Sequence, residues 1–257
     1  MIRELYLYLT TKTSKEARQF GHLYESIAIN SREKRCGEFW KPHRENCKKT
    51  ILEYLPEIKN KNSVLVLGSG PLHEIPIEAL SSQFNKVDLV DIVHLKTTKK
   101  LCRHLHNVNF IEADLTELEE NIFHEKKIIN KIPSKFTNQK YDLVISANIL
   151  SQLPNHLVNF LKKNNKYNED ILEKFRTQVC NDHYLFLQKF SAPIILFSDT
   201  ERSYYDPMGN LIEKESSFIK FGLPEPVKEW DWNLAPIPEA SKEYSIKMKV
   251  SAFILNF

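Results

Sequence analysis

The amino-acid sequence predicts a doubly wound α/β fold, in which a mostly parallel sheet of seven strands ends in an antiparallel pair and follows an N-terminal helical extension. Two observations carry this prediction. In the middle of the chain, short apolar runs alternate with longer segments of helical spacing, which is the pattern of parallel strands joined by helices. Near the C-terminus, two extended segments follow each other with no helix between them, which favours antiparallel pairing.

The first 60 residues form the predicted helical extension, which we interpret as a lid on a domain spanning residues 61–257. Over residues 13–55, basic side chains are interleaved with apolar residues at helical spacing. Pro56 and the polar run 59–62 end this segment.

Five strands alternate with helices in the predicted domain, and each is a short apolar run of the kind found in buried parallel sheets. These strands are 64–67, 87–90, 108–113, 143–145 and 193–197. The predicted helices are 76–84, 96–104 and a long region that includes 171–179, and a lysine-rich connection covers 124–140. The antiparallel pair is 227–234 and 244–255. In its second member, apolar and polar residues alternate, as in a half-buried strand.

Composition and charge exclude several classes of protein. The chain has 257 residues, of which 42% are hydrophobic and 27% charged, proportions typical of a globular protein. No apolar run approaches the roughly 20 residues that cross a bilayer, and the N-terminus lacks a secretory signal pattern. Four cysteines without a C-x-x-C pair fit a reducing compartment. We therefore expect a cytoplasmic protein that does not contact membranes.

Two further expectations concern ligands and partners. The net charge of +3 is slight, which favours a small-molecule partner over a nucleic acid. His104 and His106 lack a carboxylate or cysteine at metal-ligand spacing, so we expect no metal site. The oligomeric state is left open.

Glycines and acids directly follow the first three predicted strands, at the edge where open parallel sheets bind ligands. The turn Gly68-Ser69-Gly70 follows the first strand, Asp91 the second and Asp114 the third. Glycines permit a tight turn and close approach of a ligand, and carboxylates accept hydrogen bonds from ribose hydroxyls or an adenine amino group. Each feature has a plainer interpretation, since G-x-G turns are common and Asp114 is suited to cap a helix. Their conjunction favours a nucleoside-containing ligand.

The kind of nucleoside follows from what the glycine turn lacks. His73 stands where a dinucleotide-binding turn has its third glycine, and the turn has no Lys-Ser/Thr ending of a phosphate-binding loop. A ligand with ribose and adenine but no phosphate fits better, and S-adenosylmethionine is such a ligand. Ser146, Ala147 and Asn148, after the fourth strand, are small or polar and suited to the floor of its pocket.

These segments resemble the class I S-adenosylmethionine-dependent methyltransferases. The resemblance is carried by the antiparallel end of the sheet and by four motifs: VLVLGSG (64–70), VDLVD (87–91), EAD (112–114) and YDLVISANILSQL (141–153). It covers residues 62–257, and more narrowly it is to a poorly characterised bacterial group of methyltransferase-like proteins with a helical segment before the core. It implies a Rossmann-like sheet, S-adenosylmethionine as methyl donor and S-adenosylhomocysteine as product.

The resemblance also implies roles for the residues at the strand ends. The glycine turn and Glu74 would contact the methionine part of the cofactor, Asp91 the ribose and Asp114 the adenine, and residues 146–148 would lie beside the sulfonium. The implied cofactor-binding residues are Gly68, Ser69, Gly70, Glu74, Asp91, Ile92, Asp114, Leu115, Ser146, Ala147 and Asn148.

The acceptor site is expected outside the core of such a fold. Methyl transfer from a sulfonium mainly needs an aligned nucleophile and exclusion of water, so the family fixes no catalytic residue. The polar segments 39–44 and 198–206 are the candidates, with a packing helix and a solvated turn as their plainer interpretations. The substrate-binding candidates are Trp40, His43, Arg44 and Tyr205, and the catalytic candidates are His43, Asp199 and Arg202.

Two other hypotheses stay open beside the methyltransferase. Val66 stands where the family often places an acid, and Leu72 where a third glycine is often found. These departures motivate a catalytically inactive, methyltransferase-like module that works through binding or protein contacts. A nicotinamide-dependent reductase is disfavoured by His73 and by the antiparallel end of the sheet.

Overall fold

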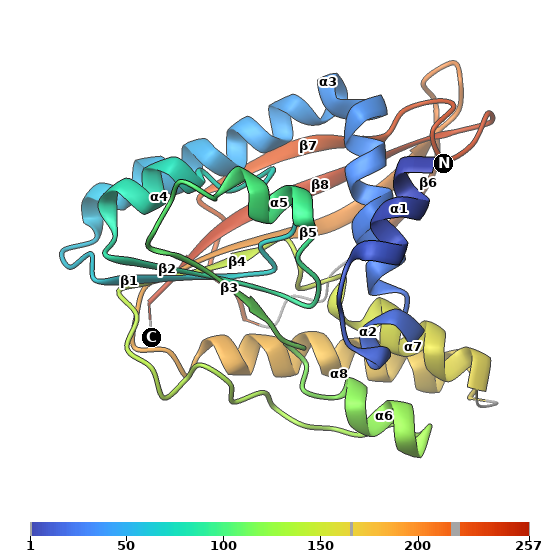
Figure 1. Ribbon diagram of the computed structural model, residues 1–257. Coiled ribbons are helices and arrows are strands. Elements are labelled where there is room, and N and C mark those ends of the chain that lie inside the picture. Colours follow the sequence, from blue (N-terminus) through green and yellow to red (C-terminus); the bar gives the residue numbers. More distant parts are fainter. Residues whose placement is uncertain (1, 165–166, 217–221, 257) are drawn as a thin grey trace.

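One mixed sheet runs through the computed structural model, which describes residues 2–164, 167–216 and 222–256 (Figure 1). Its strands are β1 (Ser63–Leu67), β2 (Lys86–Asp91), β3 (Val108–Glu112), β4 (Leu143–Ala147), β5 (Ile194–Tyr205), β6 (Leu211–Ser216), β7 (Lys228–Ala235) and β8 (Ser245–Leu255). Their order is β3-β2-β1-β4-β5-β8-β7, and β6 pairs with β5. Strands β1 to β5 are parallel, and β8 pairs antiparallel with both β5 and β7. The predicted Rossmann-like fold is confirmed.

The sheet reverses its winding between β1 and β4. From β1 the chain moves outward to β2 and β3, and it then returns to place β4 on the other side of β1. The carboxyl ends of β1 and β4 are therefore neighbours at the switch point, where such sheets bind ligands.

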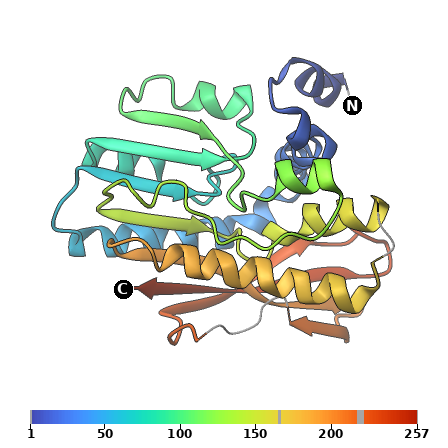
Figure 2. The ribbon, with the colours of Figure 1, turned by 90° about the horizontal axis from the view of Figure 1, so that it is seen from below.

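Helices cover both faces of the sheet. They are α1 (Ile2–Thr10), α2 (Lys15–Gln19), α3 (His22–Tyr54), α4 (Ile77–Gln83), α5 (Lys96–Leu101), α6 (Glu119–Glu125), α7 (Leu153–Asn164) and α8 (Glu169–Leu187), with a 3₁₀ turn at Leu55–Glu57. Helices α3 and α4 lie on one face, and α8 crosses the other (Figures 1 and 2). Val64 and Val66 pack on the first side and Leu65 and Leu67 on the second. Burial on both faces explains why β1 is a continuous apolar run.

The N-terminal helices stand across the carboxyl ends of the central strands (Figure 1). Helix α3 has 33 residues and changes direction along its length (Figure 1). Pro42 lies inside it and cannot donate the helical hydrogen bond, and a proline within a helix commonly kinks it. Leu7 of α1 and Leu23 of α3 pack with Val93 and Leu95, which follow β2. The extension thus covers the edge where the ligand is predicted.

Two elements differ from the sequence prediction. Strand β5 continues to Tyr205 and forms a hairpin with β6, a strand that the sequence did not predict. Every residue of β6 is exposed, so it has no apolar alternation to reveal it. Helix α6 is the second difference: it ends inside the region 124–140, which we expected to be a polar connection. Among the described residues, no helix is both long and apolar enough to cross a membrane.

Candidate functional site

The glycine turn forms a tight bend that is fastened to the end of β2. Gly68 has a φ of 72° and Gly70 a φ of 50°, in the left-handed region that favours glycine. The backbone N–H groups of Gly68 and Ser69 both donate to the carbonyl of Val90, at 2.9 and 3.1 Å. The N–H of Gly70 donates to Oδ2 of Asp91 at 2.7 Å. The structure therefore brings the glycine turn and Asp91 together.

Asp114 caps the segment that leads into α6. Its Oδ1 accepts hydrogen bonds from the N–H and the hydroxyl of Thr116, at 2.8 and 2.7 Å. Its Oδ2 accepts from the N–H groups of Leu118 and Glu119, both at 2.9 Å. Four donors use the lone pairs that a carboxylate offers. The structure therefore shows Asp114 as a cap, which is the plainer interpretation of its position in the sequence. Its contact with adenine stays a prediction.

His22, at the start of α3, links the N-terminal extension to this acidic edge. Its Nε2 contacts the carboxylate of Glu119, and its ring lies 4.0 Å from the ring of His156. Burial lowers the pKa of His22, and the negative charges of Asp114 and Asp91 act in the opposite direction. Both predicted acids are therefore near the extension. No pattern in the sequence indicates this role of His22, because it depends on how the extension packs.

Two buried polar atoms at the switch point have no hydrogen-bond partner among the described residues. They are Oγ of Ser69, which is 2% exposed, and Oδ1 of Asn148, which is 7% exposed. Leaving such groups unpaired costs about 1–3 kcal/mol each, so native structures pair nearly all of them. Both residues are in the predicted cofactor site, and their unpaired atoms fit a polar ligand at the ends of β1 and β4.

Ile149 packs directly against the glycine bend. A Cβ atom built on Gly68 would lie 2.0 Å from Cγ2 of Ile149. The side chain therefore fills the space beside Gly68 that a Cβ atom would need. A ligand can approach Gly68 on that side only after Ile149 moves. Ile149 lies within the motif of residues 141–153, but nothing in that motif indicates where its side chain points.

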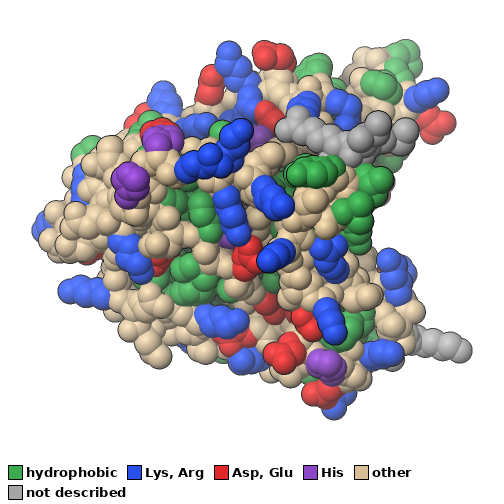
Figure 3. All heavy atoms as spheres, viewed as in Figure 1, with side chains coloured by type: hydrophobic (Ala, Val, Ile, Leu, Met, Phe, Trp, Pro, Cys, Tyr) green, Lys and Arg blue, Asp and Glu red, His purple; other side chains and the backbone are tan. Residues whose placement is uncertain are grey.

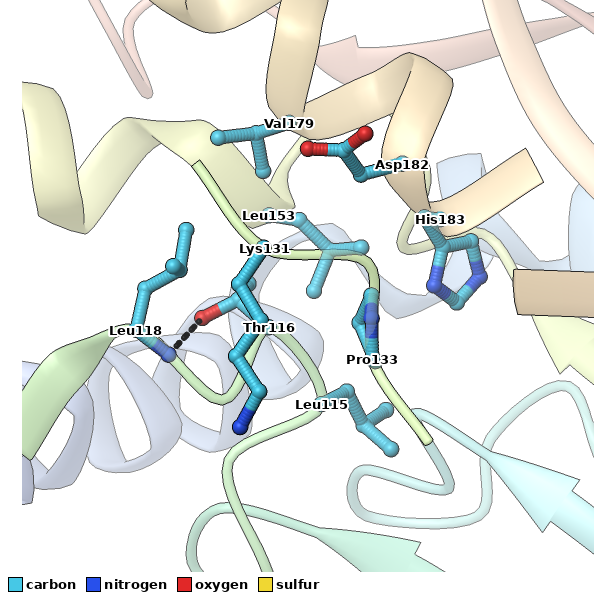
Figure 4. A pocket seen from close by; sticks show the side chains of 9 residues that line it. All are labelled: Leu115, Thr116, Leu118, Lys131, Pro133, Leu153, Val179, Asp182 and His183. Carbon is cyan, nitrogen blue, oxygen red and sulfur yellow. Dashed lines mark hydrogen bonds between the residues drawn. The ribbon is translucent and has the colours of Figure 1, made fainter. Parts of the chain in front are cut away.

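The remaining predicted residues at the strand ends divide between the two faces. Oγ of Ser146 lies 3.1 Å from Nε2 of the buried His183 on α8. Ala147 belongs to the core cluster on the α3 side, and Ile92 packs against the N-terminal helices. Leu115 lines a small pocket between the segment after β3 and α8 (Figure 4). Ser146 therefore contacts α8, whereas Ala147 packs on the opposite face.

His183 is expected to make the fold sensitive to acid. Burial lowers its pKa from 6.5 to about 3, so the folded protein keeps the ring neutral. Below pH 6.5 the unfolded chain binds a proton that the folded chain does not, and stability falls as the pH falls towards 3. Between pH 7 and pH 5, the loss from this residue is about 2 kcal/mol.

The measurement is the free energy of unfolding by urea at pH 7 and pH 5. In His183→Gln, the difference between the two pH values is expected to shrink by about 2 kcal/mol. The matched control is His106→Gln, at an exposed position, which should leave the difference unchanged. An equal pH dependence in wild type and His183→Gln contradicts the prediction.

His43 lies in a buried aromatic and acidic setting between α3, β7 and the segment after the glycine bend. Nε1 of Trp230 donates to Nδ1 of His43 at 3.0 Å, and the His43 ring stacks on Trp232 at 4.1 Å. Because an indole N–H can only donate, Nδ1 is the acceptor and Nε2 carries the proton. This Nε2 faces Oε1 of Glu74 at 3.5 Å. Burial is the largest single influence and raises the pKa of Glu74, but the hydrogen bond and charge of His43, the charge of His73 and a backbone hydrogen bond together keep that pKa below its ordinary value.

The other two candidates on α3 bind protein groups. Arg44 pairs with Glu33 on the same helix, and Nε1 of Trp40 donates to the carbonyl of Leu234 at 2.9 Å. For Trp40, the structure therefore shows a packing contact, which is the plainer of the two interpretations of segment 39–44. A role of Trp40, His43 and Arg44 in substrate binding stays a prediction.

The three candidates on β5 are spread along the strand. Asp199 is 2% exposed, and its Oδ1 accepts a hydrogen bond from Oγ of Ser151 at 2.5 Å. Arg202 contacts the sulfur of Met248, and Tyr205 lies under the ammonium of Lys247. Tyr205 lies six positions along the extended strand from Asp199, a distance of about 20 Å. Because β5 continues into a hairpin, the structure does not bring Tyr205 to the glycine bend.

No model of a known protein family matches the chain, and no curated protein matches it. Several solved structures do. Phosphoethanolamine N-methyltransferase 1 from Haemonchus contortus has a TM-score of 0.36 at 14% identity, over 61% of this chain and 26% of that one. The chain therefore spans about a quarter of that protein.

Two others are matched over most of their length. The 1,6-didemethyltoxoflavin-N1-methyltransferase from Burkholderia thailandensis has a TM-score of 0.43 at 13% identity, over 90% of this chain and 89% of that one. The N-methyltransferase NodS from Bradyrhizobium japonicum has a TM-score of 0.40 at 9% identity, over 84% and 87%. These proteins are methyltransferases. All three of the structures named here contain S-adenosylhomocysteine.

Proposed function

We propose that the chain binds S-adenosylmethionine and transfers its methyl group to a small-molecule acceptor. The observation that carries this proposal is the arrangement at the switch point. There the N–H of Gly70 in the glycine bend is bonded to the carboxylate of Asp91, and buried polar atoms of Ser69 and Asn148 have no partner among the residues that the structure describes. A ligand rich in hydroxyl and amino groups would satisfy them.

The residues at the bend fit the parts of this ligand. Asp91 keeps lone pairs beyond its contacts with the N–H groups of Gly70 and Val93, and these suit the two ribose hydroxyls. The ionised carboxylate of Glu74, held by His43, suits the ammonium of the methionine part. Ser69 offers its hydroxyl beside the bend. Bound S-adenosylmethionine supplies an already activated methyl group, so the protein's own part is to orient the reactants and exclude water.

The distribution of charge supports a small acceptor over a nucleic acid. On the face seen in Figure 3, Lys and Arg side chains are spread over the surface with Asp and Glu among them. Lys99 of α5, for example, pairs with Glu112 at 2.9 Å. Nucleic-acid sites more often gather their basic residues in one patch or stripe.

Titration calorimetry with S-adenosylmethionine and S-adenosylhomocysteine tests the proposal. We expect both ligands to bind the folded protein. Ile149→Ala, measured in parallel, removes the side chain that lies on Gly68 and is expected to bind both ligands more tightly. No binding at millimolar concentration by either the wild type or Ile149→Ala, with both proteins folded, would overturn the proposal.

The alternative is the catalytically inactive, methyltransferase-like module. The packing of Ile149 on Gly68 favours it, because an apolar side chain there restricts the space in which a ligand could approach the bend. Tight binding of S-adenosylhomocysteine without methyl transfer to any of a panel of small acceptors would support this alternative.

A further inference from the structure

Asp199 is a buried carboxylate without a cation. Among the described residues, its side chain accepts one hydrogen bond, from Ser151, and forms no ion pair. Arg176 on α8 is engaged elsewhere, since its guanidinium binds Asn155 and Glu173. A buried charge that is left unpaired is costly, and such groups are normally paired with a cation or donor. Asp199 therefore lacks the partner that its position calls for.

The surroundings of Asp199 place it beside the proposed cofactor site. Strands β1, β4 and β5 are consecutive in the sheet, so the end of the parallel part of β5 lies two strands from the glycine bend. The N–H of Asn148 donates to the carbonyl of Phe197 at 3.1 Å, which joins the turn after β4 to β5. The same turn carries Ser151, which donates a hydrogen bond to Asp199, and Asn148, whose buried Oδ1 has no partner in the described part of the chain.

The strand itself is irregular at this point. The pairing of β5 with β8 shifts register between Asp199 and Glu201. Such bulges re-aim side chains and are common next to active sites. Oδ1 of Asn148 is an unpartnered amide oxygen among the described residues, and the carboxylate of Asp199 has lone pairs beyond its bond with Ser151, so both side chains can accept hydrogen bonds. A partner for this corner must therefore bring N–H or O–H donors, and one with a positive charge would also neutralise Asp199.

We propose that Asp199 binds the cationic nitrogen of the methyl acceptor, and that the acceptor is a primary or secondary amine. This inference rests on the proposed function. A protonated amine cannot attack, because its lone pair holds a proton. Asp199 takes that proton as general base. The freed lone pair forms the new N–C bond to the methyl carbon, the C–S bond breaks, and its electron pair stays on sulfur as S-adenosylhomocysteine. The proton on Asp199 then passes to water.

Binding of three adenosyl ligands tests this role without knowledge of the acceptor. Sinefungin carries an ammonium group where S-adenosylmethionine carries the transferred methyl, whereas S-adenosylhomocysteine has neither group nor charge there. We expect wild type to bind sinefungin more tightly than S-adenosylhomocysteine. Asp199→Asn should weaken sinefungin binding about tenfold or more, the scale of losing one charge-assisted hydrogen bond. It should change S-adenosylhomocysteine binding by less than about twofold, since that ligand brings no cation to Asp199.

The controls separate this inference from the proposed function. Asp231→Asn, at an exposed position of β7, should leave all three affinities unchanged, and thermal melts confirm that Asp199→Asn is folded. An unchanged ratio of sinefungin to S-adenosylhomocysteine affinity in Asp199→Asn overturns the inference alone. An equal loss of S-adenosylmethionine and sinefungin binding also overturns it, because Asp199 then faces the sulfonium charge. If no adenosyl ligand binds wild type or Ile149→Ala, both the proposed function and this inference are wrong.

Discussion

Replacing Gly68 with alanine is expected to lower the free energy of unfolding by about 2–5 kcal/mol. Two effects add at this position. Gly68 has a φ of 72°, a left-handed conformation that costs a residue with a Cβ roughly 1–2 kcal/mol. The new Cβ would also lie 2.0 Å from Cγ2 of Ile149, and such overpacking typically costs about 1–3 kcal/mol. Equilibrium unfolding in urea at pH 7 measures the sum.

Gly70 provides a matched control for the two effects. It also has a positive φ, of 50°, but a Cβ built there meets no atom within 4 Å. Gly70→Ala should therefore show only the conformational cost, about 1–2 kcal/mol. The double variant Gly68→Ala/Ile149→Ala should be more stable than the sum of its single changes predicts. Equal losses in Gly68→Ala and Gly70→Ala would show that Ile149 does not press on the bend.

The order of elements was predictable because the sequence carries a strong local pattern. Strands β1, β2 and β4 are buried on both faces, so they appear as short, mostly apolar runs between helical segments. The antiparallel end was predictable from the alternation in β8. By contrast, β6 is exposed throughout, and it forms because β5 continues past the core and offers an edge for pairing. That cause is not local, so no pattern within β6 indicates it.

The candidate site was predictable to the extent that it follows from strand adjacency. Once β1 and β2 are parallel neighbours, the residues after them must meet, and the 2.7 Å contact between Gly70 and Asp91 is the result. Side-chain partners were harder to predict. A strand-end acid such as Asp114 suits both a ligand and a helix cap, and only the positions of Leu118 and Glu119 decide between them. The packing of Ile149 depends on a turn whose conformation the motif does not specify.

Asp91→Ala is expected to weaken binding of S-adenosylhomocysteine by about 1–3 kcal/mol, or roughly 5- to 150-fold. The carboxylate has two functions at the site. Its Oδ2 holds the N–H of Gly70, which fixes the bend, and its remaining lone pairs are proposed to accept the ribose hydroxyls. The alanine variant loses both. Titration calorimetry with S-adenosylhomocysteine measures the change.

Asp142 is the matched control, because it makes similar bonds at the opposite edge of the sheet. Its Oδ2 accepts from the N–H groups of Asn62 and Ser63, at 2.8 and 3.0 Å, where β1 begins. Asp142→Ala should therefore lower stability without changing the affinity for S-adenosylhomocysteine. Asp91→Asn retains an acceptor for Gly70 but loses the charge, so an intermediate loss of affinity is expected. Wild-type affinity in Asp91→Ala would mean that Asp91 supports the bend and does not contact the ligand.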